Sequence, residues 1–191
     1  MKIRDSGMPD EQWWESFFQP AQLLHKMQIT PDCKDVLEFG CGYGTFTIPA
    51  AQIISGQIYA LDIEFQMLQR TKEKARKLGL NNVFCLQRDF MRNGTGFPDG
   101  SVDYVMLFNL LHAEEPGVLL REVLRVLKKK GKAGIIHWIY DSSTPRGPSL
   151  EIRPKPEQCL EWSQREGLVP VHDGIIDLPP YHYGLIVQKA M

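Results

Sequence analysis

Short hydrophobic runs alternate with amphipathic segments from residue 35 onward. The runs are rich in β-branched and aromatic residues and end at Gly, Asp, Asn or Pro, which is typical of buried strands. The segments between them repeat apolar residues at helical spacing. The pattern predicts strands over 35–39, 57–62, 82–87, 102–108 and 132–139, and helices over about 44–55, 65–78 and 115–128. Such alternation is typical of a parallel sheet with crossover helices.

The N-terminal segment has a different pattern, in which aromatic residues recur at three- and four-residue intervals. This spacing predicts an amphipathic helix over 10–27, interrupted near Pro20. Its aromatic face consists of Trp13, Trp14, Phe17 and Phe18. These side chains are equally compatible with a cover over a substrate site, packing on the sheet or a dimer contact.

The C-terminal part lacks the regular alternation. Residues 141–155 are rich in Ser, Pro and Gly and are predicted to form a loop over one end of the sheet. A helix over about 155–166 follows, and the remainder is predicted to form two strands broken at Pro179-Pro180. That spacing permits antiparallel pairing at one sheet edge, so we expect a mixed sheet.

Length and charge limit the number of domains and the kinds of partner. With 191 residues and 43% hydrophobic content, the chain suits a single domain, 1–191. The 22 basic and 23 acidic residues give a net charge of −1, so no overall positive field attracts a nucleic acid. The run Lys128-Lys129-Lys130 is expected to end a helix and form a turn. A small or neutral partner is therefore expected.

The cysteines and the apolar stretches indicate in which cellular compartment the protein is expected. Four scattered cysteines form no C-x-x-C pair, which argues against a metal site and against a disulfide framework. The N-terminus lacks the apolar core of a signal peptide, and no apolar stretch approaches the roughly 20 residues that span a bilayer. We expect a cytoplasmic protein with reduced thiols and no membrane association.

Three alternate glycines follow the first predicted strand. Gly40, Gly42 and Gly44 form G-x-G-x-G, whereas the dinucleotide fingerprint requires a glycine where this chain has Thr45. No Gly-Lys-Ser/Thr follows either, so the phosphate loop of nucleoside triphosphatases is also disfavoured. By themselves the glycines are equally compatible with a tight strand-to-helix turn and with a turn that lets a ligand approach the backbone.

Acidic residues near this turn favour the ligand-binding interpretation. Asp62 ends the second predicted strand, where a carboxylate in such a fold reaches ribose hydroxyls. Glu38 lies inside the first strand just before the turn. A carboxylate in a buried strand is costly unless a donor answers it, and a ligand ammonium group would be such a donor.

Four motifs in order resemble the class I S-adenosylmethionine-dependent methyltransferases, in particular the small-molecule branch called methyltransferase type 11. They are E-F-G-C-G-Y-G, A-L-D-I, Q-R-D-F, and F-P-D-G-S-V-D-Y-V with N-L-L-H, and they lie within about residues 35–140. The resemblance implies a Rossmann-like, doubly wound α/β fold. Its sheet would have seven mostly parallel strands in the order 3-2-1-4-5-7-6, one antiparallel edge strand, and helices on both faces. Residues 1–30 would form a helical lid segment and 31–191 the core.

The resemblance also implies S-adenosylmethionine as cofactor and assigns positions to it. Glu38 would face the amino group, Asp62 would hold the ribose hydroxyls, and Asp89 would accept from the adenine amino group. The other positions implied to contact the cofactor are Gly40, Cys41, Gly42, Gly44, Ile63, Met67, Phe90, Asn109 and Leu110. Ile63, Met67 and Phe90 are equally compatible with ordinary core packing.

The methyl acceptor cannot be identified from these motifs. Because a sulfonium already carries a good leaving group, a protein base is optional. His112, His182 and Tyr181 are candidate catalytic residues at expected strand ends, and His112 is interpreted as pocket-lining. We expect methyl transfer to a small-molecule acceptor by a monomer or homodimer, with a catalytically silent S-adenosylmethionine-binding regulator as the alternative.

Overall fold

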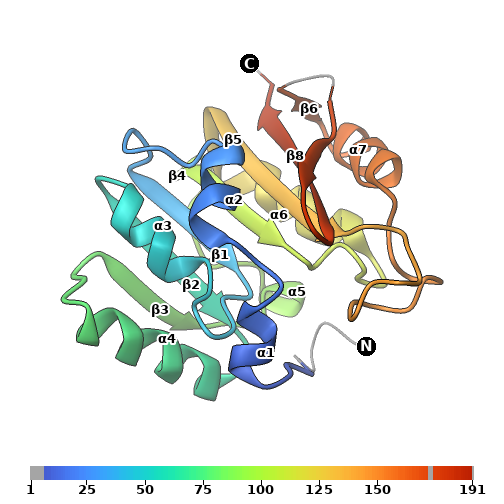
Figure 1. The fold of residues 1–191 in the computed structure, drawn as a ribbon. Helices are drawn as coiled ribbons and strands as arrows, with labels where there is room; N and C mark the ends of the chain where they lie inside the picture. Colours follow the sequence, from blue (N-terminus) through green and yellow to red (C-terminus); the bar gives the residue numbers. More distant parts are fainter. Residues whose placement is uncertain (1–6, 172–173, 191) are drawn as a thin grey trace.

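The computed structural model describes residues 7–171 and 174–190, and a central sheet dominates them (Figure 1). The sheet has eight strands in the order β3-β2-β1-β4-β5-β8-β6, and β7 pairs with β8 off this path. The strands are β1 (Asp35–Phe39), β2 (Gln57–Asp62), β3 (Val83–Gln87), β4 (Val102–Phe108), β5 (Leu127–Trp138), β6 (Leu168–Pro170), β7 (Ile176–Leu178) and β8 (His182–Lys189).

The directions of the strands confirm the predicted mixed sheet. The first five strands run parallel, whereas β8 is antiparallel to β5, β6 and β7. The predicted order is also confirmed, but the number of strands is eight rather than seven. The difference arises because the segment before Pro179-Pro180, predicted as one strand, contributes two short ones on either side of residues 172–173, which lie outside the described residues.

Helices cover both faces of the sheet. The helices are α1 (Glu11–Glu15), α2 (Pro20–Lys26), α3 (Thr47–Ile53), α4 (Phe65–Lys77), α5 (Phe90–Asn93), α6 (Pro116–Val126) and α7 (Pro156–Arg165). Buried residues of α2 and α3 pack on one face and those of α6 and α7 on the other. The side chains of β1 point alternately to these two faces and so contribute to both. Val36 packs with the residues of α2 and α3, whereas Leu37 and Phe39 pack with those of α6 and α7.

The structure confirms one prediction for the helical segments and corrects another. The predicted interruption near Pro20 is confirmed, since α1 ends at Glu15 and α2 begins at Pro20, a position where proline's missing N–H is tolerated. The run Lys128-Lys129-Lys130 belongs to β5 rather than to a helix end and turn. Leu127 is already buried and paired with Val102, and a register shift in this pair accommodates the lysines.

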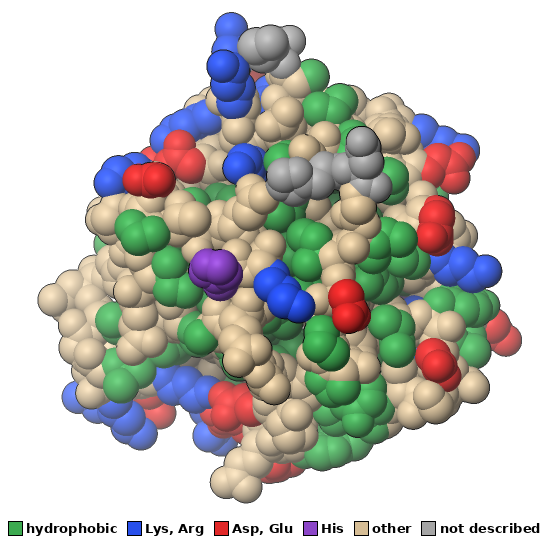
Figure 2. Space-filling view, turned by 45° about the horizontal axis from the view of Figure 1, so that its top comes forward, with side chains coloured by type: hydrophobic (Ala, Val, Ile, Leu, Met, Phe, Trp, Pro, Cys, Tyr) green, Lys and Arg blue, Asp and Glu red, His purple; other side chains and the backbone are tan. Residues whose placement is uncertain are grey.

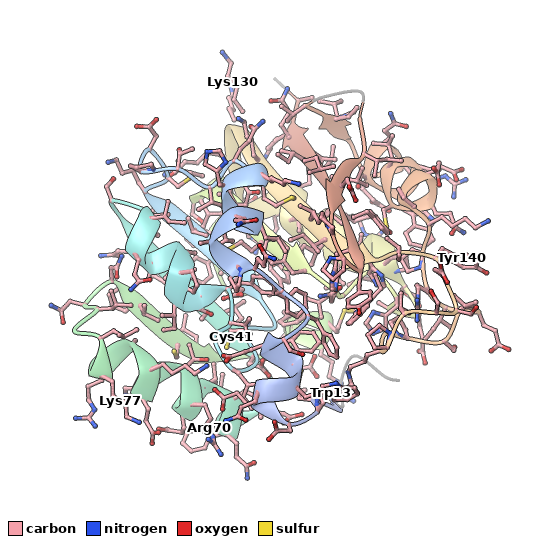
Figure 3. All side chains as sticks on the ribbon, in the orientation of Figure 1. Trp13, Cys41, Arg70, Lys77, Lys130 and Tyr140 are labelled. Carbon is pink, nitrogen blue, oxygen red and sulfur yellow. The ribbon has the colours of Figure 1, made fainter. Side chains whose placement is uncertain are left out.

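Ion pairs hold the first of these lysines. The Lys128 ammonium lies 2.8 Å from Asp35 and 3.0 Å from Asp103, at the amino ends of the parallel strands. Figure 3 shows Lys130 at the opposite end of the molecule from Trp13. On the face shown in Figure 2, acidic and basic side chains are interspersed. No helix among the described residues is long and apolar enough to cross a membrane.

A buried hydroxyl ties the N-terminal helices to the sheet. Tyr104, on β4, is 1% exposed, and its hydroxyl donates a hydrogen bond of 2.6 Å to the carbonyl of Met27, at the end of α2. The same hydroxyl lies 2.2 Å from the position that a Cβ on Gly134 would take, so only glycine fits there. This contact fixes α2 against the sheet and sets where the preceding residues lie.

We predict that Tyr104→Phe lowers the free energy of unfolding by about 1–3 kcal/mol, because the buried carbonyl of Met27 loses its donor. Chemical denaturation measures the change. The matched control is Tyr59→Phe, which removes a hydroxyl bonded to the side chain of Gln57 in an exposed setting, and a change within about 0.5 kcal/mol is expected. Equal losses in the two variants would contradict a special role for Tyr104.

Candidate functional site

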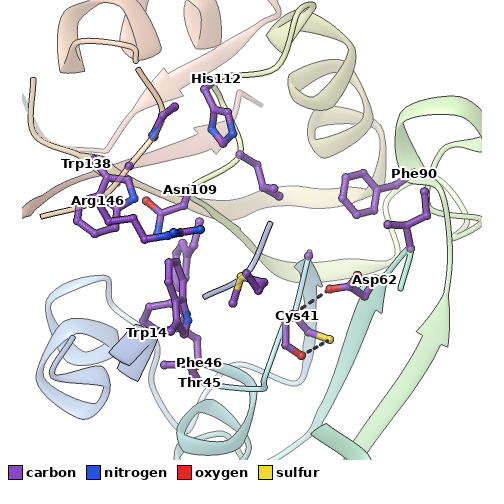
Figure 4. A pocket seen from close by; sticks show the side chains of 18 residues that line it. Trp14, Cys41, Thr45, Phe46, Asp62, Phe90, Asn109, His112, Trp138 and Arg146 are labelled. Carbon is purple, nitrogen blue, oxygen red and sulfur yellow. Dashed lines mark hydrogen bonds between the residues drawn. The ribbon is translucent and has the colours of Figure 1, made fainter. Parts of the chain in front are cut away.

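A pocket opens at the carboxyl ends of β1, β2, β4 and β5, next to the point where the strand order reverses between β1 and β4 (Figure 4). One end is formed by the glycine turn and the end of β2, and comprises Gly40, Cys41, Gly42, Asp62, Ile63, Phe90 and Leu110. The rest is lined by Met8, Trp14, Thr45, Phe46, Phe108, Asn109, His112, Trp138, Arg146, Gly147 and Pro148.

The glycine turn adopts a backbone that side chains rarely tolerate. Gly40, Gly42 and Gly44 have φ of +70°, +52° and +74°. A Cβ on Gly44 would lie 2.9 Å from the hydroxyl of Thr71, which itself donates to the carbonyl of Gly42 at 3.0 Å. The three glycines therefore form the turn, and Gly40 and Gly42 also line the pocket with backbone that no side chain covers.

Asp62 connects this turn to the end of β2. Its Oδ2 accepts from the Gly42 N–H at 2.9 Å and its Oδ1 accepts from the Glu64 N–H at 2.9 Å. Burial raises the pKa of the Asp62 carboxyl, and the two N–H groups oppose this rise. The carboxyl lines the pocket and each oxygen has a second lone pair, so it can still accept a hydrogen bond from a ligand.

Glu38 lies beneath the turn rather than in the pocket wall. Its side chain is 2% exposed and accepts a short hydrogen bond from the Thr47 hydroxyl. Burial raises the pKa of Glu38 to about 8, an effect that Thr47 opposes and the nearby Asp62 increases. This raised pKa favours the protonated form of Glu38 near neutral pH.

Two buried polar side chains in the pocket have no partner within the described residues. The amide of Asn109 has neither its oxygen nor its nitrogen bonded, and the Thr45 hydroxyl is also unbonded. Asn109 moreover has φ of +59°, an uncommon conformation for a residue other than glycine. Buried polar groups without partners are costly, so these two are suited to binding a ligand.

The structure brings together most of the predicted site residues, but not all. Besides the seven that form the glycine-turn end, Asn109 and His112 line the pocket. The predicted residues that do not line it are Glu38, Gly44, Met67, Asp89, Tyr181 and His182. Asp89 instead accepts from the Arg92 N–H at 3.1 Å and begins α5, a four-residue helix too short for its periodicity to be recognised.

The histidines differ in their access to the pocket. His112 lines it, and its Nδ1 lies 3.3 Å from Nε2 of the buried His137. His182 is packed between the rings of Phe18 and Trp138, with centroids 4.6 and 4.3 Å away. Burial lowers the pKa of His112 to about 4 and that of His182 to about 3. Both are neutral at physiological pH and are weak proton acceptors.

Several pocket residues were not predicted from the sequence. Phe108 and Trp138 end β4 and β5, so the rule that ligands bind beyond strand ends would have found them. Met8, Arg146 and Pro148 come from irregular segments in which no periodicity fixes a position. Within the described residues there is no cluster of three or more His, Cys, Asp or Glu side chains able to hold a metal ion.

The pocket fits a cofactor that combines a nucleoside with a charged amino-acid group. Open glycine backbone and the Asp62 carboxylate can bind hydroxyls and amines, and the unbonded Asn109 amide offers both a donor and an acceptor. Ile63 and Phe90 give an apolar wall beside Asp62. S-adenosylmethionine has these chemical groups.

Comparisons with known proteins agree with this fit. A family model described as a methyltransferase domain matches residues 36–131, half of the chain. A demethylmenaquinone methyltransferase from Geobacillus sp. is 34% identical over 102 residues, covering 52% of this chain and 43% of that protein. A sterol 24-C-methyltransferase from Gibberella zeae is 32% identical over 161 residues, covering 79% of this chain and 41% of that protein. The chain spans less than half the length of these relatives.

Solved structures share the whole fold. A SAM-dependent methyltransferase from Aquifex aeolicus superposes with a TM-score of 0.81 at 25% identity and covers 95% of this chain and 94% of that one. The [4+2]-cyclase SpnF superposes with a TM-score of 0.77 at 18% identity, covering 98% of this chain and 84% of that one. At this identity the similarity shows only a shared fold.

The buried Glu38 predicts how stability depends on pH. Because its pKa rises from 4.5 to about 8 on folding, the native protein keeps a proton that the unfolded chain loses between these values. The contribution of Glu38 to the free energy of unfolding should therefore fall as pH rises through this range, whereas the lowered pKa values of His112 and His182 act in the opposite direction below about pH 6.5. We predict that Glu38→Gln removes the Glu38 contribution, so that the difference in free energy of unfolding between the variant and the unaltered protein changes by a few kcal/mol at most from about pH 5 to about pH 8, as measured by urea denaturation.

The exposed Glu161 on α7 provides the control, and Glu161→Gln should leave the slope unchanged. A pH dependence in Glu38→Gln equal to that of the unaltered protein would contradict a contribution from Glu38.

Proposed function

The chain belongs to the family of S-adenosylmethionine-dependent methyltransferases, and on this premise we propose that it methylates a small-molecule acceptor bound in the pocket. The observation that carries the proposal is the hydrogen bond from the Gly42 N–H to Asp62, which joins the open glycine backbone to a pocket carboxylate. When bound, the cofactor supplies a methyl group on a positively charged sulfur that is a good leaving group.

The residues at the Asp62 end would hold the cofactor. We propose that the Asp62 carboxylate accepts from ribose hydroxyls and that Ile63 and Phe90 lie beside the adenine. Backbone groups of the glycine turn and the Asn109 side chain would contact the amino-acid portion. Glu38 and Asp89 lie outside the pocket wall and would contact the cofactor only after a small rearrangement. Otherwise Glu38 would contribute by supporting the glycine turn and Asp89 by supporting α5.

The remaining residues would receive the acceptor and exclude water from it. The aromatic side chains of Trp14, Phe46, Phe108 and Trp138 surround this part of the pocket. Methyl transfer from a sulfonium requires mainly positioning and desolvation of the acceptor, and these rings provide both. His112 is the histidine that lines the pocket, and its low pKa supports a positioning role over that of a strong base.

The N-terminal segment is proposed to act as a lid over the cofactor. The Tyr43 hydroxyl donates to the carbonyl of Pro9 at 2.8 Å, and Lys74 forms ion pairs with Glu11 at 2.6 Å and Glu15 at 2.7 Å. A Cβ on Gly42 would lie 3.2 Å from Met8 Cε, so this side chain lies against the glycine turn. Exchange of a bound cofactor would require residues 7–15 to move away from the turn.

Calorimetry with S-adenosylhomocysteine tests the proposal. We predict that Asp62→Ala and Gly42→Val each weaken binding at least about tenfold, the first by removing an acceptor and the second by forcing a branched side chain into a positive φ. Asp99→Ala serves as the control, because that exposed carboxylate pairs with Arg125 before β4, away from the strand ends that form the pocket.

Thermal melts of each variant would separate loss of binding from loss of folding. Unchanged binding in both pocket variants, or no binding by the unaltered protein, would contradict the proposal. Tight binding without turnover over a broad acceptor panel would instead support the catalytically silent regulator.

A further inference from the structure

Arg146 is a cationic side chain in the aromatic part of the pocket. Arg146 lies beside Trp14, Trp138 and Asn109, on the side away from Asp62 and Phe90 (Figure 4). No other lysine or arginine lines this pocket, as far as the described residues extend. The two ends of the pocket therefore differ in charge: one has a carboxylate and the other a guanidinium.

No carboxylate among the described residues pairs with Arg146. Its guanidinium donates to the carbonyl of Gly7 and lies 5.8 Å from the centre of the Trp13 ring, and both of these partners are uncharged. None of the ion pairs within residues 7–171 and 174–190 includes Arg146. Burial lowers the pKa of Arg146. A half-buried cation in this setting favours an anionic ligand.

A second arginine holds the backbone that carries Arg146. Arg153 is 6% exposed, and its guanidinium donates to the carbonyls of Ile139 and Asp141 at 3.0 Å, and to that of Pro148 at 2.7 Å. It also donates to the Thr144 hydroxyl at 2.7 Å. The loop between β5 and α7 is thus fixed from inside, so its pocket-facing residues are positioned before a ligand binds.

The residue after Arg146 allows the loop to approach the pocket wall closely. Gly147 has φ of +121°, and a Cβ there would lie 2.8 Å from Nη2 of Arg153 and 3.0 Å from Cγ of Trp138. A larger residue would push the loop away from β5 and move Arg146 with it. The position of the guanidinium is therefore built into the packing of Gly147 between Arg153 and Trp138.

We propose that Arg146 is a specificity-determining residue that binds a carboxylate of the methyl acceptor, and that the acceptor is a planar, largely apolar monocarboxylate. This inference rests on the proposed function. The planar guanidinium matches a carboxylate with two parallel hydrogen bonds, and the aromatic walls match a flat apolar body. A dianionic phosphate would keep one charge uncompensated at this end of the pocket, which favours a monoanion.

Two other roles for Arg146 make different predictions. The guanidinium could bind the carboxylate of the cofactor itself, in which case its loss would weaken binding of S-adenosylhomocysteine. The guanidinium could also serve only to anchor the backbone at Gly7, in which case its loss would weaken the binding of charged and neutral acceptor analogues equally. The experiment below has a separate measurement for each role.

The test measures binding of matched pairs of compounds to the full chain saturated with S-adenosylhomocysteine. The pairs are benzoate and benzamide, salicylate and salicylamide, and cinnamate and cinnamamide, which differ in charge but hardly in shape. We predict that at least one carboxylate binds the unaltered protein about tenfold or more tightly than its amide. In Arg146→Gln this preference should disappear while the affinity for the amide changes less than about twofold.

Arg165→Gln is the matched control, since that exposed arginine on α7 pairs with Glu161 and is not part of the pocket lining. It should retain the preference. Absence of any carboxylate preference, or equal weakening of both members of a pair in Arg146→Gln, would overturn the inference. So would a loss of S-adenosylhomocysteine binding in Arg146→Gln with unchanged binding of methylthioadenosine, which lacks the carboxylate. If S-adenosylhomocysteine does not bind the unaltered protein, the proposed function itself fails.

Discussion

The hydrogen bond between the Gly42 N–H and the Asp62 carboxylate is the contact on which the geometry of the pocket depends. It joins the turn after β1 to the end of β2, so that open backbone and a carboxylate face the same space. Parallel strands place these two chain positions next to each other, although 20 residues separate them. The positive φ values of the three glycines, and the clash that a Cβ on Gly44 would make with Thr71, explain why no other residue type suits the turn.

The pocket that results has two chemically different ends. The Asp62 end combines backbone groups, a carboxylate and apolar side chains, and it comes almost entirely from strands and from the turns that directly follow them. The other end combines aromatic rings with Arg146 and draws on the N-terminal segment and the loop held by Arg153. This division suits an enzyme that keeps its cofactor on the rigid sheet and selects its acceptor with irregular segments.

Three central strands of the sheet were predictable to the residue because each is a short apolar run with a clear boundary. The predicted ranges 35–39, 57–62 and 102–108 are those that the structure shows. The lysines at 128–130 were assigned wrongly because a charged run after a helix favours a helix end. In the structure these lysines belong to β5, because the segment pairs with β4 and because Lys128 forms ion pairs with Asp35 and Asp103. Tertiary contacts here outweigh local preference.

The sequence by itself determined the fold class, the glycine turn and the acidic residue at the end of β2, because strand-to-helix alternation and a fixed motif order encode them locally. Only the tertiary structure decided which predicted residues share the pocket. It placed Glu38 beneath the turn with a raised pKa and buried His182 among aromatic rings. It also brought Arg146 to the aromatic end, since the position of an irregular loop depends on long-range contacts such as those of Arg153, which no periodicity records.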